Sequence, residues 1–164
     1  MLRKAPRSKA LRVGGHFAIV ASRYNARYVN AMVRAAQQTL RAAGVQTLRT
    51  VRVPGAYEIP VAAAWLARHH RPPLAAIICL GVILRGQTSH AQLIAEAVTQ
   101  GLTQLQLQYQ IPIIHEVLLL ENKAQAQVRC LDPQHNRGLE AAHTALSMAR
   151  LMRTLTGSPA QRQA

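Results

Sequence analysis

The sequence has few acidic residues, few aromatic residues and few cysteines, and it has no hydrophobic run long enough to cross a membrane. Its 164 residues include 6 Asp and Glu, 2 Cys, 1 Trp and 1 Phe. The longest apolar run, residues 74–84, falls well short of the roughly 20 residues that span a bilayer. Cys79 and Cys130 lack the spacing of zinc ligands or of a disulfide framework. We therefore expect a cytoplasmic chain that is neither a membrane protein nor a disulfide-stapled secreted domain.

The shortage of acidic residues leaves a formal charge of +14, and Glu58 is the first acidic residue along the chain. A charge of this size is typical of nucleic-acid binders, which release counterions from phosphate backbones. The scattered aromatic residues nevertheless provide no stacking platforms for bases. Arg27, Arg34 and Arg41 recur at the spacing of one solvated helix stripe. We expect small anionic molecules as partners, and no specific binding to nucleic acid.

Strand-like and helix-like segments alternate along the chain. The predicted strands are residues 16–21, 45–53, 74–84 and 111–120. The segments between and after the strands are predicted to be helices, from their apolar periodicity or their length. They are residues 29–40, 58–68, 94–105, 122–128 and 139–149. This alternation predicts an α/β fold in which helices cover both faces of a parallel sheet.

The length is sufficient for one domain with a substantial core. We expect this domain to span residues 15–156. The basic segment 1–14 is predicted to be a flexible arm, and residues 157–164 a disordered tail.

Parallel sheets bind ligands beyond the carboxyl ends of their strands, so the strand-to-helix corners carry the functional prediction. The corner at residues 86–90 is unusual because small polar residues and a histidine follow a very apolar strand. Gly86 permits close approach of a ligand, and the amides that follow lie at the positive end of a helix, which favours a phosphate. The segment resembles a nucleotide-binding loop, but Gln87 replaces the required lysine, which argues against an NTPase.

His90 falls in the first turn of that helix. The helix dipole there disfavours an imidazolium, so His90 is a candidate for proton transfer, with an exposed polar residue as the alternative. Glu58 either complements a helix dipole or accepts hydrogen bonds from a ligand. The remaining histidines lack metal-ligand spacing, and we expect no bound metal.

Taken in order, the corners resemble the 6,7-dimethyl-8-ribityllumazine synthase family. The strongest element is VPGAYEIP at residues 53–60, and the second is GVILRGQTSH at residues 81–90. Arg129 and the turn at residues 136–138 lie at the family's spacing before the last helix. The similarity extends over about residues 15–155.

The resemblance implies a flavodoxin-like, three-layer α-β-α sandwich with a four-stranded parallel sheet, assembled as pentamers with sites between neighbouring subunits. It also implies a cofactor-free condensation of 5-amino-6-ribitylaminouracil with 3,4-dihydroxy-2-butanone 4-phosphate, the penultimate step of riboflavin biosynthesis. Riboflavin synthase is then a candidate protein partner. A non-catalytic protein on the same scaffold, binding lumazine or flavin or forming a shell, stays open as the alternative.

Site residues follow from the resemblance position by position. His90 is the implied proton-transfer residue. The implied substrate-binding residues are Tyr24, Asn25, Ala56, Tyr57, Glu58, Ile83, Leu84, Gly86, Gln87, Thr88, His115, Arg129 and Arg137. Among these, Tyr24 stacks on the pyrimidine, residues 86–88 hold the phosphate, and Arg129 comes from the neighbouring subunit.

Several positions depart from the family pattern. Gln92 stands where an acidic residue is usual, and Arg137 replaces a lysine. His115 replaces an aromatic residue and Glu116 a small one, which predicts a titratable pair near the pyrimidine. These departures motivate the non-catalytic alternative.

Overall fold

The computed structural model describes residues 13–157. The predicted arm and tail lie outside the described residues, except for Val13, Gly14 and Gly157. Val13 is buried, and its backbone N–H donates to the Ala43 carbonyl at 3.0 Å. The chain is therefore anchored to the domain from Val13 onwards.

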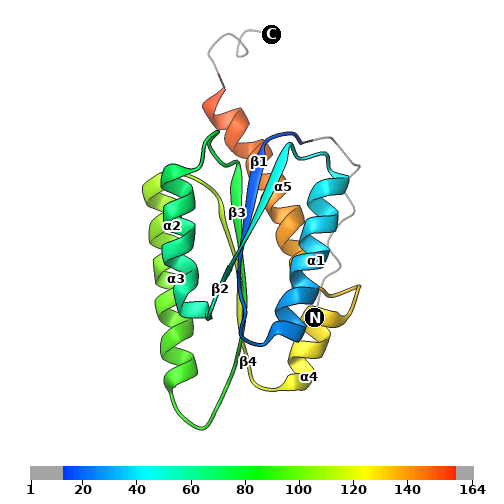
Figure 1. Ribbon diagram of the computed structural model, residues 1–164, viewed down its shortest axis with the longest axis vertical. Coiled ribbons are helices and arrows are strands. Elements are labelled where there is room, and N and C mark those ends of the chain that lie inside the picture. Colours follow the sequence, from blue (N-terminus) through cyan, green and yellow to red (C-terminus); the bar gives the residue numbers. More distant parts are fainter. Residues whose placement is uncertain (1–12, 158–164) are drawn as a thin grey trace.

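Four strands form one parallel sheet in the order β2-β1-β3-β4 (Figure 1). The strands are β1 (His16–Ser22), β2 (Thr47–Val53), β3 (Ala76–Leu84) and β4 (Ile113–Leu120). The central strand β3 is buried from Ala76 to Val82, as expected of a strand covered on both faces. The edge strand β2 is half-exposed, in keeping with its alternating polar residues. The predicted four-stranded parallel sheet is confirmed.

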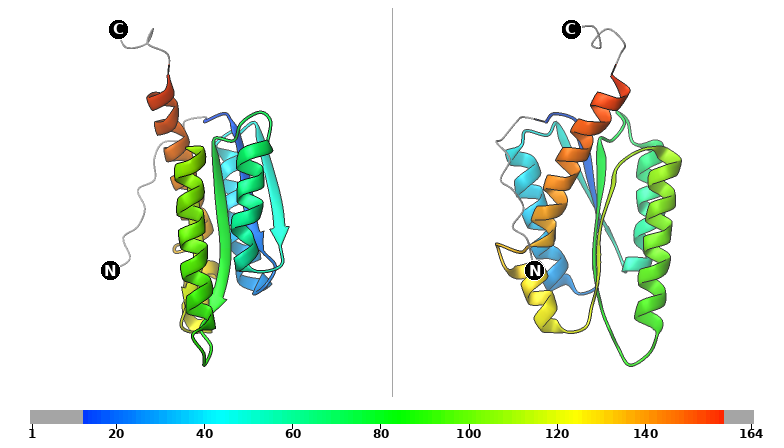
Figure 2. Two further views of the ribbon diagram at one scale, coloured as in Figure 1. Left: turned by 90° about the vertical axis from the view of Figure 1, so that its left-hand side faces the viewer. Right: turned by 180° about the vertical axis from the view of Figure 1, so that it is seen from behind.

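Helices cover both faces of the sheet, which confirms the three-layer prediction. α1 (Ala26–Ala42) and α5 (Arg137–Thr156) lie on one face, and α2 (Ile59–His69) and α3 (His90–Tyr109) on the other (Figures 1 and 2). Short segments complete the chain: the 3-10 turn η1 (Ala56–Glu58), α4 (Lys123–Ala126) and the π-helical segment η2 (Gln127–Leu131). Within residues 13–157, none of the helices has the length and apolar content needed to span a bilayer.

Local sequence explains where the helices begin and end. α1 ends because Gly44 takes φ 73°, and its N–H and that of Val45 donate back to carbonyls of the last helical turn. α2 begins with Pro60 in its first turn, where no intrahelical N–H is needed. α5 is capped by Asn136, whose Oδ1 accepts from the N–H of Gly138 at 2.9 Å.

Two apolar cores flank the sheet, and alternate residues of each strand supply them. On β1, Phe17 and Ile19 point to the core beneath α1 and α5, whereas Ala18 and Val20 point to the core beneath α2 and α3. Each large buried side chain of this kind contributes about 1.5–3 kcal/mol to folding. The sheet is therefore a rigid platform, and the corners at the carboxyl ends of its strands are held in place by it.

Candidate active site

The corners after β1, β2 and β3 converge on one cavity. Its volume is about 520 Å³, which is within the range of small-molecule sites. Predicted site residues that line it are Tyr24, Asn25, Ala56, Tyr57, Glu58, Ile83, Leu84, Gly86, Thr88 and His90. The strands are parallel, so three segments that are distant in the sequence end at the same edge of the sheet.

The corner after β1 is held by Asn25. This residue adopts a left-handed backbone with φ 55°, which asparagine tolerates better than most residues. Its side-chain Nδ2 donates to the Val82 carbonyl at 2.7 Å and so ties the start of α1 to β3. Tyr24 precedes it with 74% of its surface exposed. A rigid turn therefore presents an uncovered aromatic ring at the cavity.

The corner after β2 is closed by Glu58. Its Oε2 accepts from the Gly55 N–H at 2.9 Å, which braces the turn that leads into α2. Glu58 also lines the cavity, where it could accept hydrogen bonds from a ligand, and that role stays a prediction. Tyr57, 63% exposed, provides a second uncovered ring.

The corner after β3 leaves backbone amides uncovered. Gly86, Gln87 and Thr88 are exposed, and within residues 13–157 no hydrogen-bond acceptor is recorded for their backbone N–H groups. His90 is the first residue of α3, as predicted, and no acidic residue occupies the first turn of this helix. Free amides at the positive end of a long helix make this corner suited to an anion.

The cavity nevertheless lacks a cation of its own. Neither lysine nor arginine is among the described residues that line it. Arg85 lies beside the anion corner, but its Nε donates to Glu121 at 2.9 Å and its Nη2 to Gln92 at 3.0 Å. Within residues 13–157, a phosphate at the corner would therefore need a cation from outside this cavity for full charge compensation.

Four predicted site residues do not line the cavity: Gln87, His115, Arg129 and Arg137. Gln87 lies within the anion corner itself, between two lining residues. His115 lies on β4 and faces α3, where its Nε2 pairs with the Thr99 hydroxyl at 2.8 Å and its Nδ1 accepts from the Val117 N–H at 3.2 Å. An Nδ1 that accepts must be unprotonated, so the proton is on Nε2. Burial lowers the pKa of His115.

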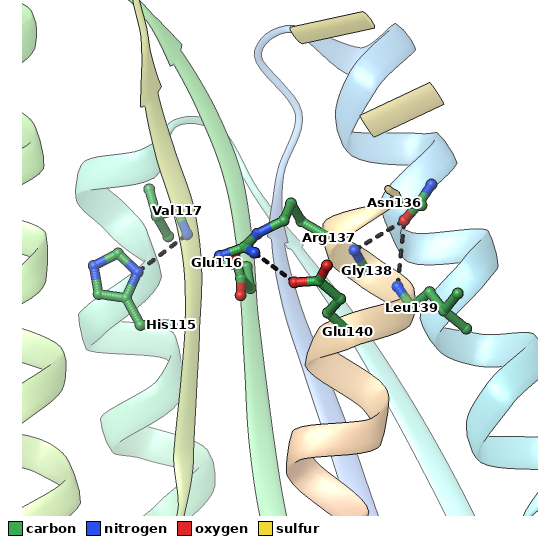
Figure 3. A network of polar contacts seen from close by, with 8 residues as sticks. All are labelled: His115, Glu116, Val117, Asn136, Arg137, Gly138, Leu139 and Glu140. Atoms are coloured by element: carbon green, nitrogen blue, oxygen red, sulfur yellow. Dashed lines mark hydrogen bonds and ion pairs between the residues drawn. The ribbon is translucent and has the colours of Figure 1, made fainter. Parts of the chain in front are cut away.

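Glu116 points to the other face of β4, towards the start of α5 (Figure 3). Its Oε2 accepts from Arg137 Nε at 3.0 Å, and Nη1 of the same arginine donates to Glu140. Burial raises the pKa of Glu116, and the charge of Arg137 opposes that rise. His115 and Glu116 therefore lie on opposite faces of β4, because successive residues of a strand point to opposite faces, and a titratable pair near the pyrimidine stays a prediction.

Arg129 lies on η2, which packs against α1. Its charge lowers the pKa of Glu116, so it belongs to the surroundings of the same carboxylate. The sequence-predicted residues thus fall into a group around the cavity and a group where β4, η2 and α5 meet, whereas His115 belongs to neither and faces α3. Among residues 13–157, no cluster of three or more His, Cys, Asp or Glu side chains is placed to hold a metal ion.

Comparisons with known proteins identify the family. Residues 14–153 match the 6,7-dimethyl-8-ribityllumazine synthase family. The chain is 39% identical over 141 residues to the protein of that name from Stenotrophomonas maltophilia (strain R551-3), covering 85% of this chain and 90% of the relative. Relatives of the same name from Xanthomonas campestris pv. campestris (strain B100) and Xanthomonas oryzae pv. oryzae (strain PXO99A) are each 40% identical over the same length and the same shares. The chain belongs to this family.

Membership of the lumazine synthase family confirms the resemblance drawn from the corners. The sequence did not single out four residues that also line the cavity: Gly55, Val82, Ala91 and Ile94. A signal for Ile94 was present, because it lies four residues after His90 and hence on the same helix face. Val82 carried no such signal, since it reads as one more apolar residue of a buried strand.

Proposed function

We propose that this chain condenses 5-amino-6-ribitylaminouracil with 3,4-dihydroxy-2-butanone 4-phosphate to 6,7-dimethyl-8-ribityllumazine, with release of phosphate. The reaction belongs to riboflavin biosynthesis, and the enzyme is a transferase. The observation that carries the proposal is the cavity in which free amides, His90 and Glu58 meet. The enzymatic reading is favoured over a non-catalytic binding protein because the relatives are named as synthases.

The chemistry needs alignment, an anion site and a proton shuttle. An amine attacks a ketone, an imine forms with loss of water, phosphate leaves by elimination, and the second amine closes the ring on the remaining carbonyl with loss of a second water. No step requires a nucleophile on the protein, so holding the two substrates together supplies much of the acceleration. His90 is positioned to move protons between the amine, the carbonyl oxygen and the leaving groups.

The proposed roles of the other residues follow from their positions. The amides of residues 86–88 hold the phosphate at the start of α3. Glu58 accepts hydrogen bonds from the ribityl chain, and Tyr24 stacks on the pyrimidine. Ile83 and Leu84 contact the pyrimidinedione from the end of β3.

The proposed site is shared between neighbouring subunits of a pentamer or a multiple of it. The absence of Lys and Arg from the described lining of the cavity supports this, because the phosphate then needs Arg129 of a neighbour. Large apolar side chains exposed on α2 and α3 also support an assembly, among them Val61, Trp65 and Leu107. A cytoplasmic location and an association with riboflavin synthase stay predictions.

Mixing the two substrates with the protein tests the proposed reaction, since the lumazine product is coloured. We expect His90→Ala to lower kcat by about 100-fold, the lower end of the usual contribution of acid–base catalysis. Some activity should remain because alignment is untouched. His16→Ala at the opposite end of β1 is the matched control. Tight binding of lumazine without any formation of product would select the non-catalytic alternative.

Complementation tests whether the site is shared. Arg129→Ala alone should weaken use of the phosphorylated ketone by about 1.5–3 kcal/mol, as for a charged hydrogen bond. Co-assembly of the His90→Ala and Arg129→Ala chains in equal amounts should restore about one quarter of the sites, because some interfaces then combine two intact halves. If both residues act within one chain, the mixture stays as inactive as its components.

A further inference from the structure

Three ion-paired side chains meet where β4 and α5 come together, and a fourth charged residue on η2 acts on one of them through its charge. We call Glu116, Arg129, Arg137 and Glu140 the β4–α5 charge cluster (Figure 3 shows all but Arg129). Glu116 is its least exposed ion-paired member, with 12% of its side chain exposed against 29% for Arg137 and 28% for Glu140. A carboxylate so nearly buried is costly unless its partners are held close.

The hydrogen bonds of Arg137 determine how its guanidinium is oriented. Nε is bound to Glu116 and Nη1 to Glu140. Among residues 13–157 no hydrogen-bond acceptor is recorded for Nη2. Arg137 is also the first residue of α5, where the helix dipole disfavours a cation. The two carboxylates offset this unfavourable interaction. The guanidinium is therefore clamped on one side and presents Nη2 on the other.

The charges of the cluster cancel when its carboxylates are ionised, since two arginines face two glutamates. An arginine in such a cluster can still donate hydrogen bonds to a neutral oxygen, but it attracts an anion less strongly than an unpaired arginine does. Glu116 links the two arginines, because it contacts Arg137 at 3.0 Å and its carboxylate also responds to the charge of Arg129.

We propose that Glu116 is a specificity-determining positioning residue: it orients Arg137 towards an uncharged oxygen of the ribitylaminouracil and weakens the hold of both arginines on phosphate. This inference rests on the proposed function, in which substrates bind where neighbouring subunits meet and Arg129 comes from a neighbour, and it adds Arg137 to the same boundary. The amides of residues 86–88 then bind the phosphate more strongly than the two arginines do. The product phosphate can therefore leave readily.

Titration with inorganic phosphate tests the charge effect without turnover. Glu116→Gln keeps an oxygen that accepts from Arg137 Nε and removes only the charge, so the fold and the clamp should persist. We expect this variant to bind phosphate about fivefold more tightly by calorimetry, the effect of one charge a few ångströms away in a partly solvated site. The matched control is Glu96→Gln, an exposed glutamate of α3 outside the described ion pairs, which should bind phosphate as the parent does.

Steady-state kinetics test the positioning effect. Glu116→Ser removes both the charge and the clamp, and we expect it to raise the KM for ribitylaminouracil about tenfold with kcat little changed, the loss of one hydrogen bond to substrate. Glu116→Gln should leave that KM near the parent value. In an Arg137→Gln background the difference between the two variants should disappear, because Glu116 acts through Arg137.

Equal phosphate affinity in the parent, Glu116→Gln and Glu96→Gln would overturn the charge argument. The positioning argument would be overturned if Glu116→Ser left the KM for ribitylaminouracil unchanged. It would also be overturned if Glu116→Ser still raised that KM in the Arg137→Gln background. A failure of the proposed function is distinguishable from both, since a chain without synthase activity would still give the phosphate titrations.

Discussion

Gly138→Ala is predicted to be among the most destabilising single changes in the domain. Gly138 is the second residue of α5 and lies against the backbone of α1. An added Cβ would meet the Met32 carbonyl oxygen at 2.1 Å and the Met32 carbonyl carbon at 2.6 Å. Non-bonded carbon atoms pack at about 3.5–4.0 Å, so the two helices would have to separate by roughly an ångström.

The size of the effect follows from three contributions. Alanine favours a helix over glycine by up to about 1 kcal/mol, which works in favour of the variant. Overpacking against a rigid backbone costs more, and separating α1 from α5 also weakens their dispersion contacts. We expect a net loss of about 3–5 kcal/mol from a total stability of about 5–15 kcal/mol. For a chain of this size that corresponds to a melting temperature lower by about 6–20 °C.

Urea unfolding followed by circular dichroism measures this loss, at one fixed protein concentration because assembly contributes to stability. Gly14→Ala is the matched control, since nothing lies within 4 Å of its added Cβ. A Gly138→Ala protein that unfolds within about 1 kcal/mol of this control would refute the close helix contact.

Three further predictions concern residues that hold the site in place. Asn136→Ala should cost about 2–3 kcal/mol in urea unfolding, because a buried side chain that caps α5 and donates to the Cys130 carbonyl is lost. Asn25→Ala should lower the melting temperature more than Asn25→Gly does. Both variants lose the hydrogen bond to the Val82 carbonyl, but only glycine adopts φ 55° freely, and thermal melting curves of the two variants test this. Burial lowers the pKa of His115, so its neutral form stabilises the fold above about pH 6.5 and this contribution is lost on acidification. His115→Gln should therefore flatten the decline in stability below about pH 6.5.

Much of the fold was predictable because its signals are local. The strands were expected at residues 16–21 and 74–84 and are found at His16–Ser22 and Ala76–Leu84. Apolar runs, and the glycines and prolines that interrupt them, depend on neighbours in the chain, so they can be read without a structure. The rotation of a helix about its axis is less local. Ala97 is apolar and lies within the predicted helical segment 94–105, yet it is exposed on α3.

The class of the protein can be recognised from its residues alone: the order of strands and helices, the corners after the strands, the histidine at the start of α3 and the family resemblance. Which charges meet depends on the packing of the elements. Arg137 and Glu116 lie 21 positions apart in the sequence, and only the packing of α5 on β4 brings them to 3.0 Å. The structure also places His115 and Glu116 on opposite sides of the sheet. The periodicity of a helix or strand depends only on the residues of that segment, so it can be predicted from the sequence. A contact between two segments depends on how the core places both of them, so it requires the structure.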